Sequence, residues 1–309
     1  MRIASTLVFL ITVGCARRSD ILFVDPALLS LVPADSIMLA GMKMEKIRET
    51  AAFKKYSTSA MFKQPLDNFE KETGIDPRKD LWEILVASNG KGKSLVFGRG
   101  SFAGMGLEPK IEKPGITRES YKGYMLFVKD DAGVVFLNSS TIAAGKTELL
   151  HEMIDARSTQ PPAPKAFLDK LTAISRNNQA WVISLNGLPF PEFLMDSGSG
   201  SSNMTRNLLA NMPRLLGSLQ SSTAVLDFSN GLHLTMVAQC PTDKDAKMLH
   251  DTLRGGLGLA RLQLPDKSPE MLKLIDAPLV TLSQSGVNLD VNYTLDDLAF
   301  LESKFSARK

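Results

Sequence analysis

Residues 81–99 read LWEILVASNGKGKSLVFGR, and this stretch predicts the fold. Two apolar runs, residues 81–88 and 94–99, flank Asn89-Gly90. Asn and Gly both tolerate a positive φ, so the pair is typical of the turn of a β-hairpin. Antiparallel hairpins are therefore expected to be the unit from which the sheet is built.

The same signal recurs in the second part of the chain. Ser-Asn-Gly stands at residues 88–90 and again at residues 229–231. In each part an apolar strand and a helical pattern precede this hairpin, and a further hairpin and a helix follow it. Because the order of elements repeats along with the tripeptide, the sequence predicts an internal duplication.

The predicted fold class is α+β, with two similar ferredoxin-like halves. Each half is expected to be an antiparallel sheet with helices packed on one face. The first half is expected over residues 32–157 and the second over residues 165–309. Residues 158–164 contain three prolines and form the expected linker.

The N-terminus has the features of an export signal. Arg2 is basic, residues 7–11 are apolar, and Gly14 precedes Cys15. The apolar run is too short to cross a hydrocarbon layer about 30 Å thick, which takes roughly 20 helical residues. We therefore expect residues 1–14 to be a removable signal peptide, and residues 15–31 to be a modified cysteine and its tether.

Thr12-Val13-Gly14-Cys15 resembles the lipobox of bacterial lipoproteins. Val13 and Gly14 fit that pattern, whereas Thr12 replaces the usual large aliphatic residue. The resemblance implies that Cys15 carries the lipid. Ala16, in place of the Asp that marks inner-membrane retention, implies an exported, periplasmic-facing protein anchored in the outer membrane. The alternative is an ordinary secretory signal that contains a cysteine.

The body of the chain is similar to a family of uncharacterised bacterial envelope lipoproteins. The similarity lies in Val-Pro-Ala-Asp at residues 32–35, Glu-Thr-Gly-Ile-Asp-Pro at 72–77 and Tyr-Lys-Gly-Tyr at 121–124. That family has no established activity, so the resemblance implies no catalytic residues.

Composition restricts the class of protein further. The 309 residues are 44% hydrophobic and 22% charged, which indicates a globular core, and the net charge is +3. A nucleic-acid partner is not expected, because it would require a concentrated basic surface. The two cysteines are Cys15 and Cys240. If Cys15 is lipidated, Cys240 has no disulfide partner and is expected to be a buried thiol.

No motif predicts a catalytic, cofactor or metal site. Residues 140–147 approach the P-loop pattern, but Ser140 replaces its first glycine, and we interpret them as a strand-to-helix turn capped by Thr147. His151, His233 and His250 lie far apart, without metal-ligand spacing.

The sequence therefore favours a non-catalytic, lipid-anchored protein that acts by binding at the membrane surface. Its expected partners are the membrane, through the lipid, and an envelope protein or a hydrophobic ligand. Met38, Met42 and Met44 are suited to core packing and also to a lipid-binding pocket. A lipid carrier would need an apolar cavity above about 300 Å³ lined by both halves. A hydrolase would need a cleft that gathers a histidine with a Ser, Asp or Glu partner.

Overall fold

The computed structural model describes residues 23–73, 75–102, 115–157, 159, 163–187, 214, 216–263 and 268–306. Within these ranges the strands are β1 (Met38–Lys43), β2 (Leu81–Ser88), β3 (Ser94–Gly100), β4 (Thr117–Tyr121), β5 (Tyr124–Lys129), β6 (Ala132–Asn138), β7 (Thr141–Lys146), β8 (Ala180–Ser184), β9 (Ser221–Asp227), β10 (Gly231–Gln239), β11 (Leu279–Ser283) and β12 (Gly286–Thr294). The helices are α1 (Pro26–Leu29), α2 (Met44–Ile47), α3 (Ala51–Tyr56), α4 (Ala60–Thr73), α5 (Thr147–Ala156), α6 (Lys165–Thr172), α9 (Asp243–Gln263), α10 (Pro269–Asp276) and α11 (Leu295–Ser306).

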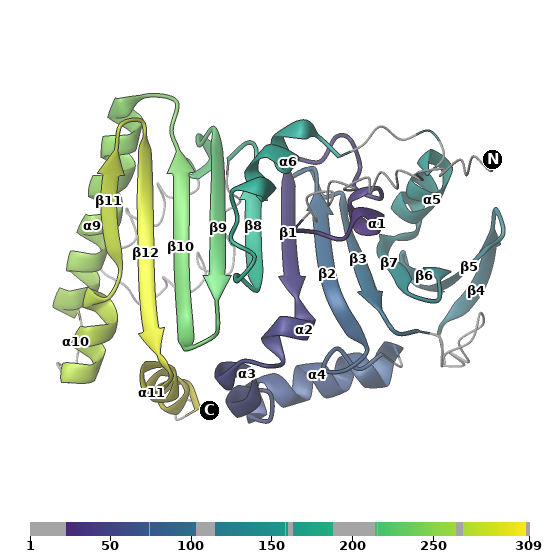
Figure 1. Cartoon of the computed structure of the whole chain (residues 1–309), viewed down its shortest axis with the longest axis horizontal. Helices are drawn as coiled ribbons and strands as arrows, with labels where there is room; N and C mark the ends of the chain where they lie inside the picture. Colours follow the sequence, from purple (N-terminus) through teal and green to yellow (C-terminus); the bar gives the residue numbers. More distant parts are fainter. Residues whose placement is uncertain are drawn as a thin grey trace, which may run out of the picture.

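The chain is an α+β protein built on one large antiparallel sheet (Figure 1). The order of its twelve described strands is β11-β12-β10-β9-β8-β1-β2-β3-β7-β6-β5-β4. Every pairing between neighbours is antiparallel. The predicted parts of the chain therefore share a single sheet, joined where β1 pairs with β8.

The four predicted hairpin arms around the Asn-Gly turns are confirmed as β2–β3 and β9–β10. In the first, Asn89 N–H donates to the carbonyl of Lys93 at 3.1 Å, so the loop covers residues 89–93. Gly90 and Gly92 have φ of 71° and 78°, which explains the glycines there. The second hairpin of each part is also confirmed, as β5–β6 and β11–β12.

Two expectations about local structure were wrong. Residues 141–146 form strand β7 and not a turn, because β3 and β6 pair with it on its two sides. Thr147 does not cap α5; its hydroxyl donates to the carbonyl of Asp131 at 3.3 Å. Strand β4 and helix α10 were not expected from the sequence.

Helices cover both faces of the sheet, so the expectation of helices on one face was also wrong. We call the face that carries Leu39 and Trp181 the front face. Side chains of α1, α5 and α6 pack there, in one cluster with Leu39, Phe97 and Trp181. On β10, Val237 belongs to the front face by register, so its neighbour Ala238 belongs to the back face. Ala238 packs with Ala246 and Leu249 of α9, which places α9 on the back.

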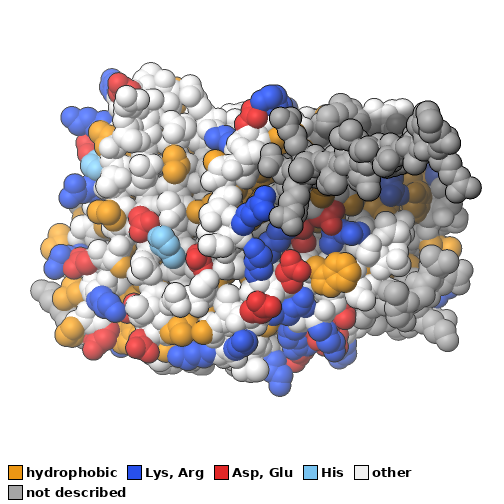
Figure 2. All heavy atoms as spheres, viewed as in Figure 1, with side chains coloured by type: hydrophobic (Ala, Val, Ile, Leu, Met, Phe, Trp, Pro, Cys, Tyr) orange, Lys and Arg blue, Asp and Glu red, His pale blue; other side chains and the backbone are white. Residues whose placement is uncertain are grey.

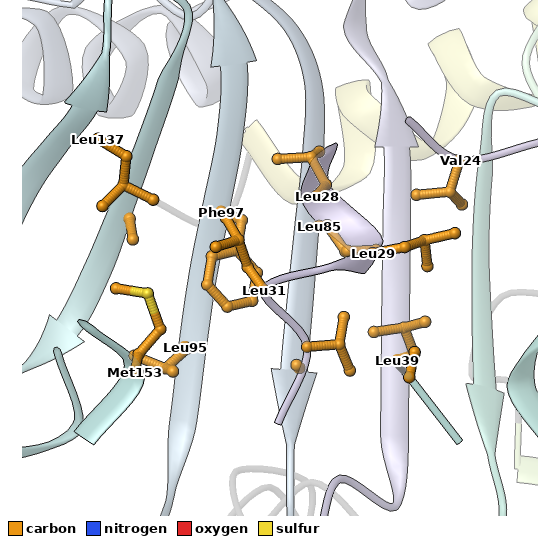
Figure 3. Packing of buried hydrophobic residues seen from close by; sticks show 14 of the residues in the cluster. Val24, Leu28, Leu29, Leu31, Leu39, Leu85, Leu95, Phe97, Leu137 and Met153 are labelled. Carbon is orange, nitrogen blue, oxygen red and sulfur yellow. The ribbon is translucent and has the colours of Figure 1, made fainter. Parts of the chain in front are cut away.

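The folded body begins upstream of Val32, within the predicted tether. Val24 and Leu28 are fully buried and Leu29 is 5% exposed. Leu28, Leu29 and Leu31 lie against strand residues such as Leu85 and Phe97 (Figure 3). Residues 23–32, which we call the N-terminal segment, are therefore part of the core on the front face.

Candidate apolar binding site

A pocket of about 500 Å³ lies at the end of the sheet where α2, α3 and α11 meet. In Figure 1, α3, α4 and α11 gather below the lower ends of the strands. The pocket is lined almost wholly by apolar side chains that come from both parts of the chain. They are Met42, Met44, Ile47, Ala52, Phe53, Leu66, Phe228, Leu232, Leu298 and Leu301, joined by Thr50, Tyr56, Ser57 and Glu302. We call this cavity the apolar pocket.

The wall from the first part follows directly from the end of β1. The chain passes from Lys43 into α2, and Met44 and Ile47 of α2 join a buried cluster with Phe53. Thr50 then starts α3, because its hydroxyl oxygen accepts the N–H of Phe53 at 3.1 Å. This cap turns Phe53 and Tyr56 of the short helix toward the pocket.

The wall from the second part is α11, together with the β9–β10 turn. Helix α11 has a reciprocal cap, in which Thr294 N–H donates to Asp297 at 2.9 Å and Asp297 N–H donates to the Thr294 hydroxyl at 3.2 Å. Lys273 Nζ donates to Asp297 Oδ1 at 2.7 Å, and this bond holds the pKa of that carboxyl below its ordinary value. The cap thus sets the start of the helix that carries Leu298 and Leu301 into the pocket.

A hydrogen bond connects the two walls. Tyr56 Oη donates to the carbonyl of Leu295 at 3.1 Å. Thr50 likewise donates its hydroxyl proton to the main chain, at the carbonyl of Ile47, over 2.7 Å. Both hydroxyl protons are therefore used within the protein, and the pocket offers a ligand mainly apolar contact.

The outside of the pocket is charged. Lys54 and Lys55 occupy the last turn of α3 and are exposed, and Lys55 Nζ lies 5.4 Å from the centre of the Tyr56 ring. Figure 2 shows Lys and Arg mixed with Asp and Glu along the part of the surface formed by α3 and α4. An apolar interior beside a charged surface is suited to an amphiphile, which buries its chain and keeps its head group in water.

A second, polar groove of about 450 Å³ lies on the front face beside α6. It is lined by His233, Thr235 and Asp227, among others. His233 Nε2 lies 2.9 Å from Asp290, and the Thr235 hydroxyl donates to the same carboxylate at 3.2 Å.

This groove gathers a histidine with acidic partners, as a hydrolase would require, but the geometry does not fit nucleophilic catalysis. In a catalytic triad, one ring nitrogen of the histidine contacts the acidic residue and the other ring nitrogen contacts the nucleophile. Here Thr235 Oγ1 lies 3.4 Å from Nε2, the nitrogen that already contacts Asp290. The same nitrogen cannot donate to the carboxylate and take the hydroxyl proton, so the groups form a hydrogen-bonded cluster on a solvated sheet face.

The remaining histidines are separate. His151 Nε2 lies 2.8 Å from Glu119, and its ring stacks on Tyr121 with 3.8 Å between ring centres. His250 Nδ1 lies 2.9 Å from Asp251. Among the residues that the structure describes, no group of three or more His, Cys, Asp and Glu side chains could hold a metal ion.

Cys240 is buried, as expected, and burial raises the pKa of its thiol. Cys15, the predicted lipidation site, lies outside the described residues, as do residues 1–14 and the tether before Phe23. Most of the predicted linker, residues 158–164, is outside them too. No helix in the described ranges is long and apolar enough to cross a membrane.

The apolar pocket was only partly signalled by the sequence. Met42 and Met44, two of the three clustered methionines, do line it. The other lining residues, such as Phe228 and Leu301, could not be predicted as part of a site, because apolar residues at helical or strand spacing usually belong to the core.

Comparison with known proteins adds little to this description. No protein-family model and no curated protein matches the chain. Three crystal forms of a protein named TP0453 have a similar arrangement. For forms I, IV and III the identities are 13%, 15% and 14% and the TM-scores 0.48, 0.47 and 0.48. Each match covers 91% of this chain, and the matches cover 97%, 97% and 98% of the TP0453 chain in forms I, IV and III. With TM-scores below 0.5, this likeness carries no argument about function.

Proposed function

We propose that this chain is a non-catalytic, lipid-anchored envelope protein that binds an acyl chain, or another apolar ligand, in the apolar pocket. The observation that carries the proposal is an open pocket of about 500 Å³, lined by apolar side chains from both parts of the chain. Its size falls in the range of about 300–1,000 Å³ that is usual for small-molecule sites. The lipid on Cys15 is part of the proposal and rests on the lipobox resemblance, which also suggests the outer membrane.

The chemistry of the pocket favours a saturated chain over a polar ligand. Each buried methylene contributes about 0.8 kcal/mol, with no requirement for a polar partner. A polar ligand would lose its hydrogen bonds to water, and the hydroxyls of Thr50 and Tyr56 already donate to the main chain. The apolar side chains that line the pocket are suited to binding an apolar ligand.

We also infer that the two parts of the chain arose by duplication. Outward from the β1–β8 pair, the order β1-β2-β3-β7-β6 is matched by β8-β9-β10-β12-β11. The fourth strand of each order is followed directly in the chain by a helix: β7 by α5, and β12 by α11. Strands β4 and β5 on one side, and α9 and α10 on the other, are then additions to a common plan. In this plan the equivalent of the β11–β12 hairpin is β6–β7, and not the β5–β6 hairpin. Ferredoxin-like describes this plan only loosely. Strand β1 pairs directly with β2, whereas the ferredoxin-like plan inserts a strand between two strands that a helix connects, and the twelve described strands form one continuous sheet.

The proposal is tested by binding of fatty acids of increasing length to the mature protein carrying Cys15→Ser. Calorimetry with dodecanoate, tetradecanoate and hexadecanoate should give an affinity that rises about 15-fold for each two methylenes, which corresponds to about 1.6 kcal/mol. The absence of saturable binding at every length would contradict the proposal.

A matched pair of variants locates the site. Leu298 lines the pocket, whereas Leu279 on β11 is 61% exposed and is not among the lining residues. Leu298→Trp should weaken binding at least tenfold by filling the pocket, and Leu279→Trp should leave it unchanged. Equal effects of the two substitutions would place the ligand elsewhere.

A further inference from the structure

The point at which the chain enters the fold is held by several contacts on the front face. The Phe23 ring packs on Trp181, with 6.2 Å between ring centres, and Lys43 Nζ lies 5.7 Å from the centre of the Phe23 ring. Two residues on, Asp25 forms an ion pair with Arg99 at 2.9 Å. The N-terminal segment is therefore held from its first described residue.

This entry point is close to the apolar pocket. Lys43, which contacts Phe23, stands between Met42 and Met44, and both methionines line the pocket. Adjacent strand residues point to opposite faces, so Phe23 lies on one side of the end of β1 and the pocket on the other.

The number of residues between Cys15 and Phe23 limits how far the body can move from a lipid on Cys15. The separation is 23 − 15 = 8 residues. Fully extended, 8 residues span at most about 28 Å. A bilayer that holds the lipid of Cys15 therefore stays within about 28 Å of Phe23, whatever path the intervening residues take.

We propose that the N-terminal segment holds the apolar pocket at the membrane in which Cys15 is anchored, so that the acyl chain in the pocket comes from a lipid of that same bilayer. This inference rests on the proposed function, because it requires both the anchor and apolar binding. A short connection raises the effective concentration of the membrane at the pocket, and a longer one lowers it, because the body then spreads farther from the bilayer along its normal. Loading from the anchoring bilayer should therefore depend on tether length, whereas the intrinsic affinity should not.

The test uses the native, lipidated protein in vesicles of phosphatidylethanolamine and phosphatidylglycerol. The probe is a phosphatidylethanolamine with a photoreactive diazirine in its acyl chain, and the initial rate of labelling of the protein is measured. A variant with 24 Gly and Ser residues inserted between residues 22 and 23 has a connection four times as long. Its labelling rate should fall about twofold, because the root-mean-square reach of a flexible connection doubles when its length increases fourfold. An unchanged rate, or a wild-type protein without an acyl mass on Cys15, would overturn the inference.

A second measurement separates this inference from the proposed function. Without vesicles, Cys15→Ser forms of both tether lengths are labelled by a diazirine fatty acid in solution. Equal and saturable labelling of the two forms supports apolar binding and shows that the insertion has not disturbed the fold. No labelling of either form would refute the proposed function itself. Equal labelling in solution together with equal labelling on vesicles would refute only the role of the tether.

Discussion

The pairing of β1 with β8 joins the two walls of the apolar pocket, and a single added methyl group should weaken it. At Gly41 of β1, an added Cβ would lie 2.4 Å from two ring carbons of Trp181 and 2.6 Å from its indole nitrogen. Trp181 is only 1% exposed, so its ring cannot move freely into solvent. Gly41→Ala therefore forces a rearrangement at the centre of the sheet.

Two opposing effects determine the magnitude. Alanine in place of glycine in a strand interior stabilises a protein by roughly 0.5–1 kcal/mol, since it reduces the freedom of the unfolded chain. Gly41 has no positive φ that would prevent the replacement. Overpacking of a close-packed core costs about 1–3 kcal/mol. The net result should be a loss of about 1–2 kcal/mol in the free energy of unfolding.

Urea unfolding followed by circular dichroism measures this loss, and the chain offers a matched control. At Gly258 in α9, an added Cβ meets nothing within 4 Å. Gly258→Ala should stabilise the protein by up to about 1 kcal/mol through helix propensity. Glycine to alanine is thus expected to lower the free energy of unfolding at Gly41 and to raise it at Gly258.

A double variant tests the cause. Trp181→Phe shortens the ring that the new methyl group meets, so Gly41→Ala should cost less in the Trp181→Phe background than in the wild type. If Gly41→Ala is as stable as the wild type, or if the two substitutions are simply additive, the reasoning about close packing at β1–β8 is wrong.

Three further predictions concern single groups. The pKa of Asp297 is lowered from its ordinary value of 3.8 by Lys273, so its stabilising effect is present at neutral pH and is lost as the pH falls through the folded pKa. The stability gap between wild type and Asp297→Asn should therefore shrink in acid unfolding curves, and a constant gap would argue against the ion pair. The thiol of Cys240 is buried with a raised pKa, so Ellman's reagent should react with it only on unfolding; rapid reaction of the native Cys15→Ser protein would contradict this. Asp25→Ala removes the cap of α1 and an ion pair, so hydrogen exchange at residues 28–32 should become about tenfold faster, and unchanged exchange would mean that packing alone holds the segment.

The hairpins could be predicted because their signals are local. At residues 88–90 and 229–231 the turn chemistry and the apolar runs on either side together define two adjacent strands. Strand β7, in contrast, has the sequence TIAAGK, whose small residues give little alternation. It becomes a strand because β3 and β6 offer hydrogen-bonding partners on both sides. These partners lie outside the segment, so residues 141–146 alone do not predict the strand.

The sequence by itself determined the hairpins, the helix that follows each series of strands and an apolar, methionine-containing stretch after β1. Only the tertiary structure decided that helices cover both faces and that Met44 and Leu301 line one pocket. The physical reason is that alternation along a strand or helix shows which side chains avoid water, but not which distant element covers them. The antiparallel pairing of β1 with β8 supplies that information, because it brings two remote segments to the same end of the sheet.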